Sequence, residues 1–262
     1  MPAAVLEKEQ TVTRNKRIEA LDLLRGGAMV LVVIYHILYD LVYIYKIDIP
    51  RPLVPGQPEI EFVHICFLWV LFAVSGICSG YSRDPVKRGA VLYIIGWLIT
   101  AVTSYIMPSQ LIVFGVLSCF GACMAITSLI RPVIDKIPPY LLAVMMILLW
   151  IMFSDFHRGG IIHLGFTDVT VPLPAAGDYL YPVGIKSKHF YSSDYFPVIP
   201  YIFMFITGYA VHGYVRSGRL PKWFYRSSPD ALKVICFIGR HSLIIYALHQ
   251  PVLLAVFSVI IY

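Results

Sequence analysis

Long apolar windows recur along the whole chain, and short polar connections separate most of them. Most windows approach the roughly 20 residues, with few charges, that an α-helix needs to cross a bilayer core. They cover residues 26–45, 61–81, 89–107, 111–130, 139–153, 197–215 and 238–260. The pattern predicts an all-α polytopic membrane protein with about seven transmembrane helices.

Positive side chains mark one side of the predicted spans. They occur before the first window and after the second, fourth and sixth, whereas the opposite connections carry few. Because Lys and Arg concentrate in cytoplasmic loops, we expect a cytoplasmic N-terminus and an external C-terminus. The residues concerned are Arg14, Lys16, Arg17, Arg25, Arg83, Lys87, Arg88, Arg131, Lys136, Arg216, Arg219, Lys222, Arg226 and Lys233.

Composition narrows the class of protein further. A mean hydropathy of +0.75 with 58% hydrophobic residues exceeds what one soluble core of this size could bury. We expect a multi-pass protein of the cytoplasmic membrane with a single domain over residues 1–262. Residues 1–17 are polar and the first apolar run is too long for a signal-peptide core, so this run is expected to be an uncleaved anchor.

The formal net charge of +6 lies mostly on the predicted inner side. These positive side chains either set the topology and contact anionic lipid, or bind a polyanionic cytoplasmic ligand. No interleaving of basic and aromatic residues suggests a nucleic acid partner.

One connection is much longer than the others and is expected outside. Residues 154–196 are too polar to span a membrane, yet six Tyr and Phe fall between residues 179 and 196. A loop of this length in a compact protein is functional or disordered, and its aromatic content favours a folded lid over the outer mouth.

The cysteines and two of the glycines indicate helix packing rather than a disulfide or metal site. All five cysteines lie in or beside predicted spans, so no disulfide framework is expected. Cys119 and Cys123 share a helix face without a second ligand pair, which favours packing over a metal site. Gly76 and Gly80 are four residues apart and predict close approach of another backbone.

A polar stripe follows the first predicted span. At 100° per residue its members fall within about 60° of one another on the helix. Ionisable groups at this depth cost several kcal/mol unless they face a protein interior and find partners, so the stripe is expected to line an internal cavity. Its members are Asp22, Arg25, Met29, His36 and Asp40.

His36 and Asp40 are the candidate catalytic pair of this stripe. The spacing of four residues lets the carboxylate accept a hydrogen bond from one imidazole nitrogen and leave the other basic, which builds a general base. A buried pair that only joins helices is the other reading. Asp22 is expected to pair with Arg25 and position it.

Two further histidines are predicted at similar depth. His64 lies one turn into the second span, near the expected level of Asp40, and His249 lies on the last span near the level of His36. Both could border the same cavity, although packing is an equally good reading of each. Pro251 is expected to kink the last helix.

Four stretches together resemble a known family. They are "RIEALDLLRGGAMVLVVIYHILYDL", "SGICSGYSRDPVKRG", "SDYFPVIPYIFMFITGYAVHGY" and "IGRHSLIIYALHQPVL". The chain resembles the bacterial relatives of heparan-alpha-glucosaminide N-acetyltransferase, a family of transmembrane acyltransferases. The spacing from Arg25 to His36 is also similar to that of the membrane acyltransferase-3 enzymes.

The resemblance implies transfer of an acetyl group from cytoplasmic acetyl-CoA to a glycan or amino sugar outside, with a membrane histidine as the catalytic group. The lysosomal member has this histidine in the stretch after its first span, but residues 46–60 here contain none. His36 is therefore the first candidate and His64 the second, with Asp40 beside them. Whether the acceptor is an amine or a hydroxyl stays open.

Arginine suits the phosphates of CoA, because its planar fork binds phosphate oxygens in pairs. We expect the donor to be held by Arg25, Arg83, Arg88 and Arg240, with His249 nearby. No metal is expected. The alternatives are a proton-coupled transporter that uses His36 and Asp40, and a haem or metal protein that uses the three histidines. Monomer and homo-oligomer both stay open.

Overall fold

The computed structural model describes residues 17–171, 179–187 and 189–261. Arg14 and Lys16 of the positive pattern, and residues 172–178 and 188 of the predicted lid, lie outside this part of the chain. The fold divides into two compact units. The first comprises Met1–Leu71 with Tyr214–Tyr262, and the second comprises Phe72–Gly213. The prediction of a single domain stays a prediction.

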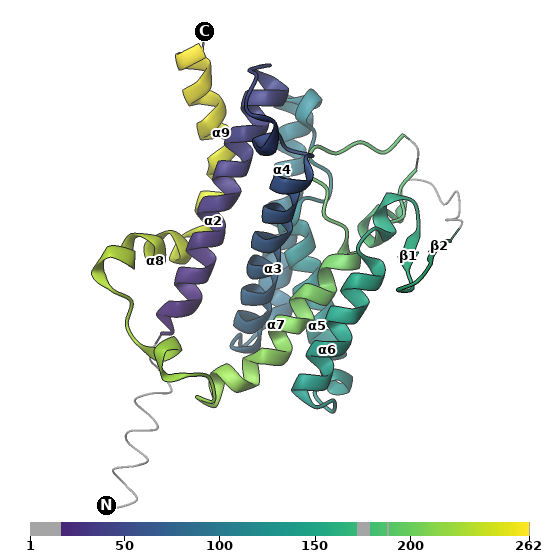
Figure 1. Cartoon of the computed structure of the whole chain (residues 1–262), viewed down its shortest axis with the longest axis vertical. Helices are drawn as coiled ribbons and strands as arrows, with labels where there is room; N and C mark the ends of the chain where they lie inside the picture. The colour runs from purple at the N-terminus through teal and green to yellow at the C-terminus, as the bar shows by residue number, and fades with distance from the viewer. Residues whose placement is uncertain (1–16, 172–178, 188, 262) are drawn as a thin grey trace, which may run out of the picture. The chain divides into compact units, whose positions relative to one another are not determined.

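The first unit joins the two ends of the chain. Its central helix α2 contacts α8 and α9, so segments about 200 residues apart lie side by side (Figure 1). The first half of α3 completes this unit. Its elements are α2 (Glu19–Tyr39), a π-helical turn (Asp40–Ile44), 3-10 turns (Arg51–Leu53, Lys222–Tyr225, Asp230–Leu232), α3 (Pro58–Gly80), α8 (Lys233–Arg240) and α9 (Ser242–Ile261).

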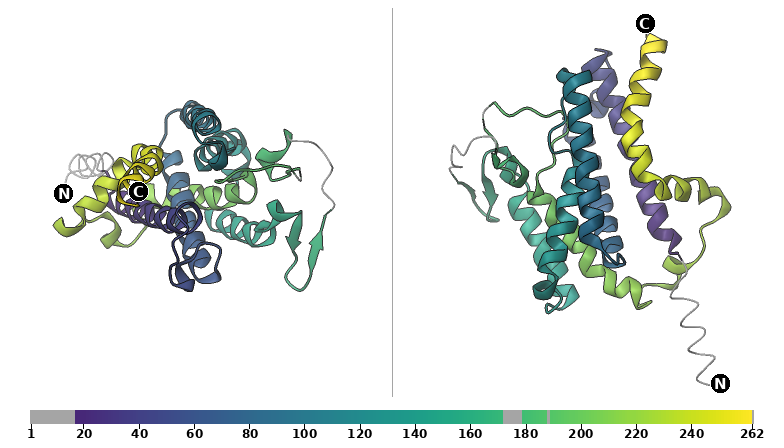
Figure 2. Two further views of the ribbon diagram at one scale, coloured as in Figure 1. Left: turned by 90° about the horizontal axis from the view of Figure 1, so that it is seen from above. Right: turned by 180° about the vertical axis from the view of Figure 1, so that it is seen from behind.

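The second unit is a helical bundle that carries a small hairpin. The helices α4 and α5 form its most extensive contact, and the antiparallel hairpin packs against the end of α6 (Figure 2). Its elements are the end of α3, α4 (Pro85–Ile106), α5 (Val116–Ile134), α6 (Pro139–Phe153), most of α7 (Val198–Arg216), 3-10 turns (Pro108–Gln110, Phe156–Arg158, Tyr181–Val183), β1 (Ile161–His163) and β2 (Asp168–Thr170).

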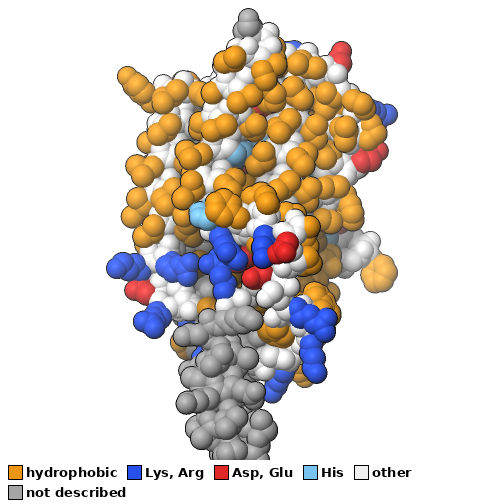
Figure 3. All heavy atoms as spheres, turned by 90° about the vertical axis from the view of Figure 1, so that its left-hand side faces the viewer, with side chains coloured by type: hydrophobic (Ala, Val, Ile, Leu, Met, Phe, Trp, Pro, Cys, Tyr) orange, Lys and Arg blue, Asp and Glu red, His pale blue; other side chains and the backbone are white. Residues whose placement is uncertain are grey.

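Seven helices in the described residues are long and apolar enough to span a membrane. The predicted all-α membrane class and number of spans are confirmed. Figure 3 shows the face that carries α8 and α9, where hydrophobic side chains cover the long helices and Lys and Arg gather toward one end. Apolar side chains turned outward fit a lipid environment, because hydrocarbon accepts them at no cost.

Two predicted spans are shorter in the structure than the apolar windows. The fourth span was expected to begin at residue 111, but α5 begins at Val116 after a non-helical stretch in which Phe114 has a φ of 56°. The last span was expected to be continuous over 238–260, but α8 ends at Arg240 and α9 begins at Ser242. In both places polar or glycine residues interrupt the apolar run, and window averaging hides the interruption. The helix α9 continues through Pro251.

Close helix packing at Gly76 and Gly80 is confirmed within the second unit. A Cβ atom on Gly76 would clash with the carbonyl of Phe205 in α7, and one on Gly80 would clash with the His212 ring. The same two helices are therefore held at backbone contact. Farther along α7, the Tyr209 hydroxyl donates to Asp135 and accepts from Arg131 at 2.7 and 2.9 Å.

The described part of segment 154–196 is folded against itself. The Tyr195 hydroxyl donates to the Tyr181 carbonyl at 2.6 Å, and Phe190 stacks on Tyr181 with ring centroids 5.4 Å apart. His163 joins the hairpin to the end of α6, because its two ring nitrogens contact Asp168 at 2.8 Å and Asp155 at 3.0 Å. The aromatic content thus corresponds to local packing, and the lid role stays a prediction.

We predict that His163 makes the hairpin less stable at alkaline pH. Its hydrogen bonds to Asp168 and then Asp155 raise the pKa of His163 above the usual value. The stabilisation is complete below the ordinary histidine pKa and is lost as pH rises through the raised value. Amide exchange protection of β1 and β2 should fall across that range in the wild type. The fall should disappear in His163→Gln but persist in His189→Gln, an exposed control; equal pH dependence in both variants would refute the prediction.

Candidate functional site

The structure brings together two of the predicted histidines on α2 and α9. The rings of His36 and His249 meet edge to face, with centroids 4.6 Å apart. Each Nδ1 points to a carbonyl of its own helix, at 2.9 Å from Val32 and 2.6 Å from Tyr246. A carbonyl only accepts, so each Nδ1 carries the proton and each Nε2 is the basic nitrogen.

His64 reaches the same cluster from α3. Its ring stacks on Tyr35 with centroids 4.2 Å apart, while Tyr35 meets His36 edge to face at 6.1 Å. His64 therefore lies at the level of Tyr35, about one turn below the expected level of Asp40. The three histidines therefore lie close together in the first unit, while the cavity that they were expected to border stays a prediction. We call His36, His64 and His249 with Tyr35 the histidine cluster.

Asp40 is fully buried but does not bond His36, so that expected hydrogen bond is wrong. Its Oδ1 accepts from Gln250 Nε2 of α9 at 2.8 Å, and its Oδ2 has no hydrogen-bond partner among the described residues. The reason is that α2 ends at Tyr39 and a wider π-helical turn begins at Asp40, while His36 bonds back to its own helix. Such turns are frequent at functional sites.

Two residues of this region, Tyr35 and Glu61, were not among the predicted site residues. The Glu61 carboxylate accepts from the Tyr35 hydroxyl at 2.8 Å and from His64 Nδ1 at 3.3 Å. The spacing of three residues between Glu61 and His64 on a helix was a visible signal. This spacing was overlooked because the candidate site was sought on the first span.

The predicted pairing of Asp22 with Arg25 is also wrong. Asp22 is buried and bonds Arg17 at 2.6 and 2.9 Å and Arg240 at 3.2 Å. Glycines cause this, because a Cβ on Gly239 would clash with the Asp22 carbonyl, so α8 approaches α2 at backbone contact. Asp22 faces α8 and therefore finds Arg240.

The four expected phosphate-binding arginines belong to different units. Arg25 and Arg240 lie in the first unit, where Arg240 is partly engaged by Asp22. Arg83 and Arg88 are exposed in the second unit, beside the start of α4. Their grouping around one ligand stays a prediction. Among the described residues there is no group of three or more His, Cys, Asp or Glu side chains that could hold a metal ion.

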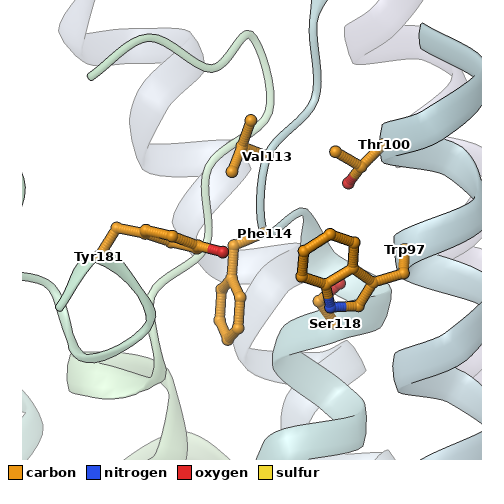
Figure 4. Close-up of a pocket in the computed structure, with 6 residues that line it drawn as sticks. All are labelled: Trp97, Thr100, Val113, Phe114, Ser118 and Tyr181. Carbon is orange, nitrogen blue, oxygen red and sulfur yellow. The ribbon is translucent and has the colours of Figure 1, made fainter. Parts of the chain in front are cut away.

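The second unit has a hollow between α4, the start of α5 and the 154–196 segment. Figure 4 shows the Tyr181 hydroxyl turned toward Phe114 and Trp97 there. The hollow measures about 200 Å³ with its open mouth. Pockets for small molecules begin at roughly 300 Å³, so this one does not by itself define a substrate site. Its lining residues are Trp97, Thr100, Val113, Phe114, Ser118 and Tyr181.

Fold and site together define a polytopic helical membrane protein with titratable side chains gathered inside its first unit. A comparison with family models then identifies the family. The model described as heparan-alpha-glucosaminide N-acetyltransferase, catalytic, matches residues 17–251, and the chain belongs to this family. The family is one of transmembrane N-acetyltransferases, so membership implies acyltransferase activity. Searches of curated proteins and of solved structures returned no significant match.

We predict that the hydrogen bond from Gln250 to the buried Asp40 stabilises the fold. Replacing Gln250 with Met removes the hydrogen bond that Gln250 donates to the fully buried Asp40 carboxylate and should lower the free energy of unfolding by about 1–3 kcal/mol. In an Asp40→Asn background the same change should lower the free energy of unfolding much less, because no buried charge then loses a hydrogen bond. Denaturation in detergent measures both costs. Equal costs in the two backgrounds would show that Gln250 acts only through packing.

Proposed function

We propose that the protein transfers an acetyl group from cytoplasmic acetyl-CoA to an amine or hydroxyl of a sugar on the other side of the cytoplasmic membrane. The observation that carries the proposal is the histidine cluster, which stands inside a member of an N-acetyltransferase family. Acyl transfer needs a base or a nucleophile where donor and acceptor meet, and imidazole can serve as either near neutral pH.

His36 is the residue to which we assign the chemistry. It is eleven residues beyond Arg25, which places it about 16 Å farther along α2 and well inside the span. Its Nε2 is the basic nitrogen, and it either takes the proton of the acceptor or carries the acetyl group. Asp40 stands one turn away and acts through the field of its carboxylate and through Gln250 rather than by a direct bond.

The donor is proposed to enter from the side that carries most of the positive charge. Arg25, Arg83, Arg88 and Arg240 are the candidates for the CoA phosphates, and Asp22 holds Arg240 in a fixed orientation. His249 touches His36 and would border the reactive end of the donor. The 154–196 segment is proposed to close over the acceptor on the opposite side.

We predict that His36→Ala abolishes transfer while donor binding survives. Transfer of labelled acetyl to glucosamine and release of CoA thiol should both fall by about 100-fold or more, because general-base and nucleophilic groups contribute at least that much. The Kd for acetyl-CoA by calorimetry should stay within about twofold, since His36 lies about 16 Å along α2 from Arg25, one of the proposed phosphate ligands.

His241→Ala is the control for this experiment. His241 is an exposed histidine between α8 and α9, and its Nδ1 also bonds a carbonyl of its own helix. It should keep wild-type turnover. Unchanged turnover in His36→Ala would remove His36 from the mechanism.

A further inference from the structure

The Glu61 carboxylate is held by three donors from three parts of the first unit. Its Oε1 accepts from the Tyr35 hydroxyl of α2 at 2.8 Å and from the Gly56 amide at 3.0 Å, and its Oε2 accepts from His64 Nδ1 at 3.3 Å. Gly56 belongs to the connection just before α3. A carboxylate fixed at both oxygens has little freedom to reorient, so it is preorganised for His64.

This contact decides which nitrogen of His64 is basic. A carboxylate only accepts hydrogen bonds, so the Nδ1 of His64 must donate and its Nε2 is left as the acceptor. The Nδ1 of His64 faces a carboxylate, whereas the Nδ1 atoms of His36 and His249 face backbone carbonyls. A carboxylate behind an imidazole also stabilises the imidazolium that forms when the ring takes a proton.

His64 is partly exposed rather than buried. Its side chain is 21% exposed and that of Glu61 is 29% exposed. His64 lies six residues after Pro58, about 9 Å from the end of α3 that is predicted to lie outside. Tyr35 and Phe67 cover its ring, with centroids 4.2 and 5.1 Å away. The ring is therefore packed against two aromatic rings while part of the side chain stays exposed.

We propose that Glu61 is a positioning residue that holds His64, with Tyr35, as the base on the acceptor side of the reaction. The proposal rests on the proposed function and deepens it, because it assigns the proton of the acceptor to one residue. His36 is then left to act on the acetyl group.

The acceptor nitrogen or oxygen forms a bond to the acetyl carbonyl carbon, and its proton passes to His64 Nε2. The bond from that carbon to its carrier then breaks, with the electron pair going to the leaving atom, which is the CoA sulfur in direct transfer. Glu61 stays ionised throughout and steadies the imidazolium.

The competing view is that Glu61 only joins α2 to α3. The bond from Tyr35 alone would achieve this, and it would be indifferent to the tautomer of His64. The two views therefore differ in the protonation pattern of one ring, which can be measured without any substrate.

The first test is nitrogen NMR of protein labelled with ¹⁵N-histidine in lipid vesicles, with the His64 signals assigned by His64→Gln. In the wild type, at a pH where the ring is neutral, Nδ1 should be protonated and Nε2 bare. In Glu61→Gln the preference should relax to a mixture, because an amide can donate or accept. A bare Nδ1 in the wild type, or an unchanged pattern in Glu61→Gln, would overturn the proposal.

The second test is kinetic and uses a matched pair of variants. Glu61→Gln should lower kcat for acetyl transfer to glucosamine by about 10- to 100-fold, as loss of such supporting contacts does, with the KM for acetyl-CoA unchanged. Glu59→Gln, an exposed carboxylate on the same turn, should stay within about twofold of the wild type, and Glu61→Asp should recover part of the rate. Equal kcat in the two Gln variants would overturn the assignment. Absent turnover in the wild type would instead contradict the proposed function and leave the NMR test intact.

Discussion

A polar side chain on an apolar helix has to find its hydrogen-bond partners inside the protein, because hydrocarbon offers none. In the first unit this constraint determines which helices meet. Asp22 is satisfied by Arg17 and by Arg240 of α8, and Asp40 is satisfied at one oxygen by Gln250 of α9. Glu61 of α3 is satisfied by α2 and by the connection before α3. Each of these three carboxylates thus ties a different part of the chain to the region around α2.

The same hydrogen bonds between helices position the imidazoles so that they can accept and donate protons. Once α3 and α9 are fixed beside α2, His64 and His249 lie on either side of Tyr35 and His36. Carbonyl and carboxylate partners then give every Nδ1 the proton, so the cluster presents Nε2 as its basic nitrogen. A membrane acyltransferase needs this kind of group within reach of both aqueous sides, and the family to which the chain belongs catalyses acetyl transfer.

Sequence reasoning predicted the helical spans and the grouping of the histidines, because hydropathy and helical periodicity report them directly. It failed on the partners of Asp22 and Asp40. Spacing along one helix shows which residues share a face, but it does not show that glycine packing brings Arg240 closer than Arg25, or that a π-helical turn directs Asp40 to Gln250. Glu61 was overlooked although its spacing from His64 was readable. The break at His241 was hidden by averaging over an apolar window.

The central claim is that acetyl groups cross the membrane through this protein from donor to acceptor. It is tested most directly with purified protein in vesicles of known orientation, with acetyl-labelled acetyl-CoA placed on the face rich in Lys and Arg and glucosamine on the other. Labelled N-acetylglucosamine should appear on the acceptor side only, and none should form when acetyl-CoA is added to that side instead. Labelled product from either placement, or glucosamine uptake without acetylation, would contradict the account and favour a soluble-type transferase or a transporter.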